Sequence, residues 1–396
     1  MHPSEEIFCE KTNRLSGKTI VLGITGSIAA VESFHLIREL IRHGARVIPV
    51  MTPEACRITT PEAIEFAAGI KPIVEIGGQC EHILHLGDPS DADLFLVYPC
   101  SFNTIAKMAC GIADTSVTTM ASVALGSEVP VAIAPAMHGY MFDNPALANN
   151  LKTLEGMGVN VIGPHVDSGR AKVASVQEVV AWAIRLLSRD DLVGKRVLII
   201  GGRSEEPLDS MRIITNRSTG LMAVTLATTA FERGADVELW MGACSVPLPD
   251  FIPLKRYCSV DELIKMVDGV DHDVVIVPAA LADFAPAVIA EGKIPSDKGF
   301  EMEMRPVPKV LPLLREKCAK VIGYKAESGL TESELVKRAR SRLESYDLSA
   351  VVANDVDSAG KTSASMLLVT RDRVQNISGT KPAISNMILN YISENL

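Results

Sequence analysis

Aromatic residues are scarce in this chain: Phe, Trp and Tyr together make up 5% of its 396 residues, although 47% of the residues are hydrophobic. Most of the apolar content is therefore aliphatic. This composition is typical of buried parallel sheets, whose strands read as near-continuous Val, Ile and Leu runs. The chain is too long for one ordinary domain, so its length predicts two or three.

Basic charge is also in deficit, with a formal net charge of -9. This balance argues against a protein that binds nucleic acid through a basic face, but it leaves room for local phosphate pockets. The most apolar long window, residues 274–290, contains Pro278, Asp283 and Pro286, so we expect no membrane span. The polar N-terminus of mixed charge does not fit a secretory signal.

Paired cysteines are missing as well. The eight cysteines are scattered and none forms a C-x-x-C pair, which argues against a zinc ribbon or a thioredoxin-like motif. Scattered thiols in a chain of this length are typical of a reduced intracellular protein. We therefore expect a soluble, cytoplasmic protein.

Two segments of the chain begin in the same way, KTIVLGITGS at Lys18 and KRVLIIGGRS at Lys195, each with a basic residue, an aliphatic run and a glycine turn. The polar stretch 188–194 before the second one marks a domain boundary. We predict domains at 1–190 and 191–396. Each half alternates aliphatic runs with helical patterns, which predicts α/β folds with doubly wound parallel sheets and ligands beyond the strands' carboxyl ends.

The predicted strands are residues 19–24, 46–51, 94–98, 129–134 and 159–162 in the first half, and 197–200, 236–241, 274–277, 321–324 and 350–353 in the second. The main predicted helices are residues 29–43, 104–108, 116–125, 146–157, 176–187, 221–233, 260–267 and 332–346.

The stretch TIVLGITGSIAAVE passes from an aliphatic run through Gly26 and Ser27 into good helix formers. Backbone N–H groups at such a turn face outward, and with the helix dipole they form an anion site. The G-x-G-x-x-G fingerprint is absent, and the small residues and hydroxyls suit a terminal phosphate monoester better than a pyrophosphate. A tight βα turn without a ligand is the alternative.

Polar side chains also follow the predicted strands 94–98 and 129–134. Ser101, Asn103 and Thr104 stand where a helix should start, so an N-cap is an alternative to ligand binding. Residues 133–145 carry Met137 and His138 with little charge. Such a loop is typical of a flavin or substrate wall, although core packing also explains methionines.

Two histidines, His82 and His85, stand three apart in CEHILH. A clear third metal ligand is missing, so a neutral histidine that bonds a carboxylate or a flavin edge fits better than a metal site. The sequence leaves the metal ligands unassigned.

The second half carries MRIITNRSTG, in which Arg212 and Asn216 come just before a helical pattern. This cluster of hydrogen-bond donors predicts a second anion site, for a ligand with more polar groups than the first. Asp283 stands between apolar residues after a strand, and an isolated acid there favours a nucleotide or metal role. Lys293 and Lys298 lie on a loop, where plain solvation is the alternative.

In order, GITGSIAA, PCSFNTIAKMACGIADT, PAMHGYM, GGRSEEPLD, ITNRSTG, AALADFAP, GYKAE and ANDV resemble the bifunctional coenzyme A biosynthesis family. That family fuses phosphopantothenoylcysteine decarboxylase to phosphopantothenate–cysteine ligase. The resemblance runs from about Lys18 to the C-terminus. It implies a flavodoxin-like decarboxylase domain followed by a Rossmann-like ligase domain. It also implies a homo-oligomer, because the flavin of this family lies at subunit contacts.

For the first domain, the resemblance implies FMN-dependent oxidation of the cysteine thiol, loss of carbon dioxide, and reduction to phosphopantetheine. The implied residues are Gly26, Ser27, Ser101, Asn103 and Met137 for FMN, His82 for catalysis with His85 as a rival, and His138 for the substrate carboxylate. The family's flap cysteine has no counterpart in HVDSGRAKVAS. The proton donor is therefore unassigned, with Cys110 as a candidate.

For the second domain, the resemblance implies that CTP activates phosphopantothenate as an acyl-cytidylate, which the amine of cysteine then attacks. ATP stays open as the nucleotide. The chemistry needs cations on the triphosphate, a donor for the oxyanion, and Mg²⁺. The implied residues are Asn216 and Arg212 for the acyl intermediate, Asp283 and Tyr324 for the nucleotide, and Lys293 with Lys298 for the phosphates. In the alternative interpretation only the ligase is active, and the first domain is a flavin-binding regulatory or assembly module.

Overall fold

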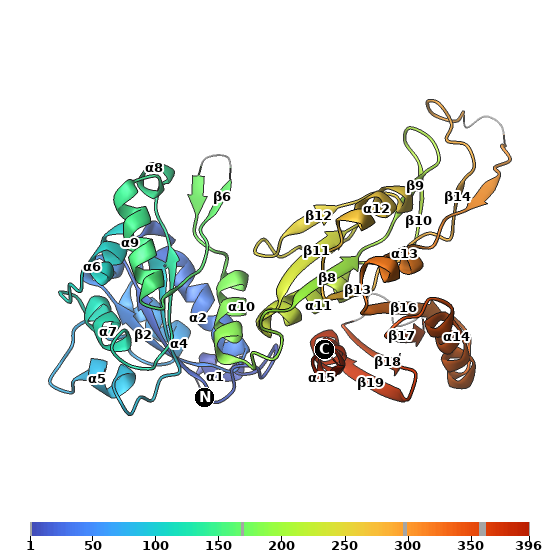
Figure 1. The fold of residues 1–396 in the computed structure, drawn as a ribbon. Helices are drawn as coiled ribbons and strands as arrows, with labels where there is room; N and C mark the ends of the chain where they lie inside the picture. The colour runs from blue at the N-terminus through green and yellow to red at the C-terminus, as the bar shows by residue number, and fades with distance from the viewer. Residues whose placement is uncertain (1, 168–169, 296–298, 356–361, 396) are drawn as a thin grey trace. The chain divides into compact units, whose positions relative to one another are not determined.

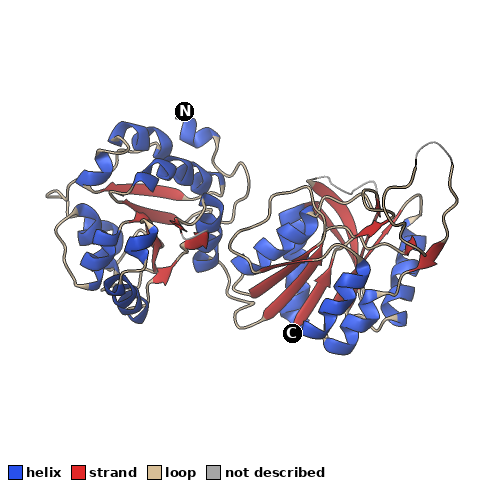
Figure 2. Cartoon of the chain, turned by 90° about the horizontal axis from the view of Figure 1, so that it is seen from above, coloured by secondary structure: helices blue, strands red, loops and turns tan. Residues whose placement is uncertain are grey.

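The structure is a computed structural model that describes residues 2–167, 170–295, 299–355 and 362–395. Its contacts divide the chain into two compact units, residues 1–188 and 189–396. We call them unit 1 and unit 2, and each has its own sheet with helices on both faces (Figures 1 and 2). None of the helices in the described ranges is long and apolar enough to cross a membrane.

Unit 1 contains a five-stranded parallel sheet of order β2-β1-β3-β4-β5. Its strands are β1 (Thr19–Ile24), β2 (Arg46–Met51), β3 (Leu94–Cys100), β4 (Val131–Pro135) and β5 (Asn160–Val161). This order is the flavodoxin-like one, in which the direction of winding reverses between β1 and β3. The predicted α/β class is thus confirmed for unit 1.

Alternating residues of the unit 1 strands feed two cores. On β1, Ile20 and Leu22 pack with α2, α4 and α10, whereas Val21 packs with α5, α6, α7 and α9. The helices are α1 (Pro3–Glu6), α2 (Ser33–Arg42), α3 (Pro53–Cys56), α4 (Pro61–Ala68), α5 (Glu81–Leu86), α6 (Phe102–Ala109), α7 (Ser116–Ala124), α8 (Gly139–Phe142), α9 (Pro145–Gly156) and α10 (Val176–Leu187). The predicted helix 29–43 is divided into a 3₁₀ turn, η1 (Ile28–Glu32), and α2. A short hairpin, β6 (His165–Asp167) and β7 (Arg170–Lys172), precedes α10.

Unit 2 contains an eight-stranded sheet of order β12-β11-β8-β13-β16-β17-β18-β19. Its strands are β8 (Arg196–Gly201), β11 (Asp236–Met241), β12 (Leu254–Arg256), β13 (Val274–Val277), β16 (Val321–Glu327), β17 (Ala350–Asp355), β18 (Ser363–Val369) and β19 (Val374–Thr380). In chain order the first six have the Rossmann arrangement 3-2-1-4-5-6. The last two are antiparallel additions that the sequence did not predict.

The helices of unit 2 cover both faces of this sheet (Figure 1). They are α11 (Leu221–Glu232), α12 (Val260–Met266), η2 (Val267–Gly269), α13 (Val310–Lys317), α14 (Glu332–Ser345) and α15 (Lys381–Asn395). α11 and α15 share one core, and α12, α13 and α14 share the other. Two short antiparallel pairs, β9 (Glu205–Pro207) with β10 (Ile213–Thr215) and β14 (Phe284–Pro286) with β15 (Met304–Pro306), stand apart from the main sheet.

Candidate functional site

Unit 1 has a cavity of about 400 Å³ at the carboxyl ends of β1, β3 and β4, where the winding reverses. We call it the unit 1 cavity. Five residues that the sequence singled out line it: Gly26, Ser27, Ser101, Asn103 and Met137. Three separate loops supply them, so the fold brings together side chains that lie more than one hundred residues apart.

The loop after β1 is fixed against its neighbours by two contacts. The Thr25 hydroxyl donates to the Pro99 carbonyl at 2.7 Å and accepts from the Ser101 N–H at 2.9 Å. At Gly26 a Cβ atom would lie 2.5 Å from the Cβ of Glu54. A side chain there would force the first loop away from α3, so glycine allows the close approach that shapes the cavity.

The serines of this cavity differ in what their hydroxyls do. The Ser101 Oγ accepts from the Thr104 N–H at 3.3 Å and caps α6, the alternative role that the sequence left open. Ser27 is the N-cap residue of η1 but makes no side-chain capping bond. Its hydroxyl and the N–H groups of the first turn are therefore available to an anion.

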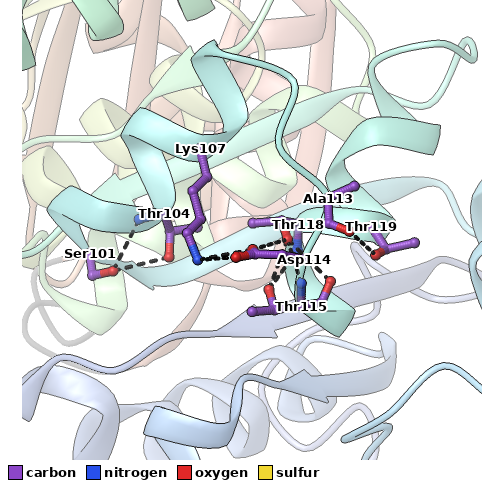
Figure 3. A network of polar contacts seen from close by, with 8 residues as sticks. All are labelled: Ser101, Thr104, Lys107, Ala113, Asp114, Thr115, Thr118 and Thr119. Carbon is purple, nitrogen blue, oxygen red and sulfur yellow. Dashed lines mark hydrogen bonds and ion pairs between the residues drawn. The ribbon is translucent and has the colours of Figure 1, made fainter.

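Lys107 of the cavity lining forms an ion pair that the sequence did not predict. The Lys107 Nζ donates to both carboxylate oxygens of Asp114 at 2.9 and 2.7 Å (Figure 3). Next to it, the hydroxyls of Thr115 and Thr118 form a reciprocal capping box at the start of α7. The pair thus ties the polar loop before α7 to α6.

The donor set of the unit 1 cavity fits a flavin mononucleotide. The hydroxyl of Ser27 and the side-chain amide of Asn103 suit a phosphate and a polyol chain. The thioethers of Met137 and Met141 provide an apolar wall for a ring system. The residues present therefore suit the phosphate and the ring in one cavity.

The three histidines that the sequence singled out in unit 1 lie outside the lining of this cavity. His82 and His85 are on α5; the His85 Nδ1 is 2.8 Å from an Asp91 oxygen, whereas the His82 Nδ1 is buried without a partner in the described part of the chain. His138 is exposed, and its ring stacks on Tyr140 at a centroid distance of 5.3 Å. The two rival histidines thus differ in their contacts: the His85 ring is bonded to Asp91, and the His82 Nδ1 is not bonded to any described residue.

Cys110 is exposed at the C-cap of α6. Cys110 is not among the residues that line the cavity, although Lys107 of the same helix is. Its role as a proton donor stays a prediction. Residues 168–169 of the flap stretch lie outside the described residues.

Unit 2 has a cavity of about 440 Å³ over the carboxyl ends of β13, β16 and β17, which we call the unit 2 cavity. The sequence-predicted residues Asn216, Asp283 and Tyr324 line it. Gly220, in the left-handed conformation with φ of 82°, is the N-cap of α11 at one side of the cavity. A helix N-terminus with a glycine cap suits a phosphate.

Asn216 is attached to the loop after β13. Its Nδ2 donates to the carbonyls of Ala280 and Leu281, each at 3.1 Å. Both of its N–H groups are therefore used in this state, and the side chain fixes the position of the loop that carries Asp283.

Asp283 is not the isolated acid that the sequence suggested. Its carboxylate accepts a hydrogen bond from the Lys309 ammonium, and this bond lowers the pKa of the Asp283 carboxyl. Lys309 comes from the N-cap of α13, which only the tertiary structure brings to this loop. The ion pair lies on the lining of the cavity and is partly exposed.

Arg212 and Lys293 do not line the unit 2 cavity in the described structure. The Arg212 guanidinium donates to the Ile294 carbonyl at 2.8 Å and lies 3.5 Å from Asp209. The buried Asp209 carboxylate also accepts from the N–H of Arg212 at 2.7 Å and of Ile294 at 3.0 Å. The sequence missed Asp209, which joins the two loops. Lys298 lies outside the described residues.

The sequence also missed most cations of the unit 2 cavity. Besides Lys309, the lining includes Lys325 from β16, Arg342 from α14 and Lys381 from the start of α15. Lys325 stands in GYKAE, where a polar residue at a strand end was a usable signal. Arg342 and Lys381 gave none, because each belongs to a helix that reaches the cavity only through long-range packing.

No cluster of three or more His, Cys, Asp or Glu side chains suited to a metal ion is present among the described residues.

The family model for "Flavoprotein" matches residues 9–188, and that for "DNA/pantothenate metabolism flavoprotein C-terminal domain" matches residues 192–396. The coenzyme A biosynthesis bifunctional protein CoaBC of Thermococcus kodakarensis is 42% identical over 380 residues, which is 94% of each chain. That of Methanocaldococcus jannaschii is 36% identical over 402 residues, covering 100% of this chain and 98% of the relative. A crystal structure of the C-terminal domain of a CoaBC protein aligns with 52% of this chain and 97% of its own, at 26% identity and a TM-score of 0.44.

Proposed function

The chain belongs to the family of coenzyme A biosynthesis bifunctional proteins, which are decarboxylases and ligases, and from this premise we propose how its two units divide the work. Unit 2 joins cysteine to phosphopantothenate at the cost of a nucleoside triphosphate. Unit 1 decarboxylates the resulting phosphopantothenoylcysteine to phosphopantetheine. The product of one unit is thus the substrate of the other.

The observation that carries the ligase proposal is the lining of the unit 2 cavity. The N-terminus of α11 at Gly220 and the surrounding Lys and Arg side chains suit a triphosphate. The Asp283–Lys309 pair orients an acid at the rim. We assign CTP as the nucleotide from the family resemblance. We assign Mg²⁺ from the same resemblance.

The decarboxylase proposal is supported by the fit of the unit 1 cavity to FMN. Ser27 and Asn103 would hold the phosphate and the ribityl chain, and Met137 would contact the ring. When bound, FMN supplies two-electron oxidation and reduction of the substrate. His82, whose buried Nδ1 has no hydrogen-bond partner among the described residues, is our assignment for the proton transfers. In this proposal the chain acts as a homo-oligomer, in which a neighbouring copy brings His82 to the cavity.

The decisive experiment is a pair of single-turnover assays with the purified full chain. The first follows pyrophosphate release and amide formation from phosphopantothenate, cysteine and CTP. The second follows carbon dioxide release, flavin absorbance and product mass from phosphopantothenoylcysteine.

Full turnover in both assays supports the proposal, and it requires a residue other than the missing flap cysteine to donate the reductive proton. Ligase turnover without carbon dioxide release, with flavin bound, would overturn the decarboxylase assignment. The first domain would then be a flavin-binding regulatory or assembly module.

A further inference from the structure

The product of the proposed unit 1 reaction carries a hydrogen atom where the substrate carries a carboxylate. A proton therefore has to arrive at the carbon that carbon dioxide leaves, and a positioned acid makes such a transfer fast. His82 can serve the removal of the thiol proton during the oxidation. The donor of the carbon-bound proton is left open, so unit 1 needs a second acid–base group.

The described lining of the unit 1 cavity has two ionisable side chains, and neither suits this step. The Lys107 ammonium is held by both carboxylate oxygens of Asp114, at 2.9 and 2.7 Å. Glu54 lies against the loop after β1, since a Cβ atom on Gly26 would come 2.5 Å from the Glu54 Cβ. It therefore belongs to the end of the cavity assigned to the phosphate, whereas the ring is assigned to the methionine wall.

The methionine wall itself carries an imidazole. Ala136, Met137 and Met141 line the cavity, and His138 stands between them as the N-cap of α8. The His138 carbonyl accepts from the N–H of Met141 at 2.9 Å, so the backbone of the histidine is tied to the turn that presents this methionine. The residue is exposed, and a substrate that enters the cavity along this wall can reach its ring.

The His138 ring is oriented without being engaged. Neither ring nitrogen has a hydrogen-bond or ion-pair partner among the described residues. The ring stacks on Tyr140 at a centroid distance of 5.3 Å and an interplanar angle of 30°, and such an aromatic contact favours one ring orientation. Imidazole readily gains and loses a proton near neutral pH. His138 is thus free to carry a proton to a substrate.

We propose that His138 is the acid that protonates the carbon from which carbon dioxide leaves. The inference rests on the proposed decarboxylase function and adds the proton donor that this function left open. His82 keeps the removal of the thiol proton.

The step balances as follows from the enethiolate that remains once carbon dioxide has left. A proton from the His138 imidazolium forms a C–H bond at the nitrogen-bearing carbon, and the carbon that bears sulfur becomes a thioaldehyde. The thioaldehyde carbon then accepts the hydride equivalent that the substrate lost in the oxidation and that reduced FMN holds in the meantime. Solvent protonates the resulting thiolate and returns a proton to His138.

The test is His138→Gln in the FMN-loaded full chain, in a single turnover of phosphopantothenoylcysteine. Glutamine keeps a hydrogen-bond donor but cannot supply a proton, so carbon dioxide release should stay close to the wild-type rate. Formation of phosphopantetheine should slow on the order of a hundredfold, as for loss of an acid–base group. The enethiol should accumulate, lighter than phosphopantetheine by one hydride and one proton. His35→Gln, which changes an exposed histidine of α2 outside the cavity lining, should match the wild type.

A chemical footprint measures the contact without turnover. Diethyl pyrocarbonate acylates accessible imidazoles, and the masses of the peptides locate the label. Phosphopantetheine, which is the product, should protect His138 in the FMN-loaded chain. His35 should react equally with and without it.

Four results would overturn the inference. Carbon dioxide release that falls as far as phosphopantetheine formation would limit His138 to binding the substrate. Phosphopantetheine formation at the wild-type rate would exclude it as the acid, and accumulation of the enethiol in Cys110→Ser would assign the proton to Cys110. Equal labelling of His138 with and without phosphopantetheine would exclude the contact. Absence of carbon dioxide release from the wild-type chain would instead refute the proposed function, and it differs from all four because each of them is scored on a chain that binds or decarboxylates normally in its wild-type form.

Discussion

The Thr25 hydroxyl accepts a hydrogen bond from the N–H of Ser101 at 2.9 Å, so a side chain at the end of β1 holds the residue that caps α6. The same hydroxyl donates to the Pro99 carbonyl at 2.7 Å. This bridge spans the two strands between which the winding of unit 1 reverses. The walls of the unit 1 cavity therefore depend on one buried hydroxyl.

Thr25→Val should remove this bridge while keeping the side-chain shape. It leaves a buried N–H and a buried carbonyl without a partner, which should cost about 2 kcal/mol of unfolding free energy. We also expect weaker FMN binding, measured by flavin titration of the apoprotein alongside urea unfolding. Thr25→Ser retains the hydroxyl and should stay close to wild type. Equal flavin affinity in the Val variant would show that the bridge does not shape the cavity.

Substitutions of the two histidines of α5 should differ in their effect on the rate of decarboxylation. His82→Asn should lower the rate of carbon dioxide release on the order of a hundredfold or more, as for loss of an acid–base group. His85→Asn should have little effect, because the His85 ring already bonds Asp91. Flavin content, read from absorbance, should be equal in both variants. A larger loss in the His85 variant would reverse the assignment.

The Asp283–Lys309 ion pair on the lining of the unit 2 cavity predicts a change in the pH dependence of ligase kcat/KM. The hydrogen bond from Lys309 lowers the pKa of Asp283, so Lys309→Met should raise that pKa toward its ordinary value. If the Asp283 carboxylate is needed, the acid limb of the ligase kcat/KM profile should move to higher pH. Asp283→Asn should cost about tenfold or more at neutral pH, the equivalent of roughly 1.4 kcal/mol.

The control for this pair is Lys317→Met, at the other end of α13. Lys317 pairs with the exposed Asp268 at 2.8 Å, in an ion pair away from the cavity lining. Its profile should superimpose on that of the wild type. An unmoved acid limb in the Lys309 variant would mean that Asp283 does not act as an anion in the rate-limiting step.

Asp209 should contribute an acid-sensitive part of the stability of unit 2. N–H groups of Met211, Ile294 and Arg212 lower its pKa. A depressed carboxyl pKa stabilises the fold above the unfolded value, about 3.9, and this stabilisation is lost as the pH falls toward the folded value. Asp209→Asn should therefore be less stable at neutral pH and lose less stability below about pH 4.

Urea midpoints at neutral and acidic pH measure this effect. Asp372→Asn, which changes an exposed carboxylate, should follow the wild type at both. Parallel pH dependence in the wild type and the Asp209 variant would show that another acid dominates.

The sequence by itself determined the α/β class and most of the parallel strands. Aliphatic runs gave strands β1, β2, β11 and β13 with the bounds that the structure has, because a strand buried on both faces needs continuous apolar residues. Polar motifs at strand ends drew attention to Ser27, Ser101 and Asp283, which line the two cavities, since parallel strands bring their carboxyl ends to one edge.

Only the tertiary structure decided which partners those residues contact. β19 has a single buried position and β18 is buried only in its second half, so antiparallel pairing of β18 with β17 and of β19 with β18 defines them. The Asp283–Lys309 pair joins residues 26 positions apart, and Lys381 reaches the unit 2 cavity because α15 packs against α11. Partners of this kind depend on strand register and helix packing, which balance many weak long-range contacts and leave no local signature in the chain.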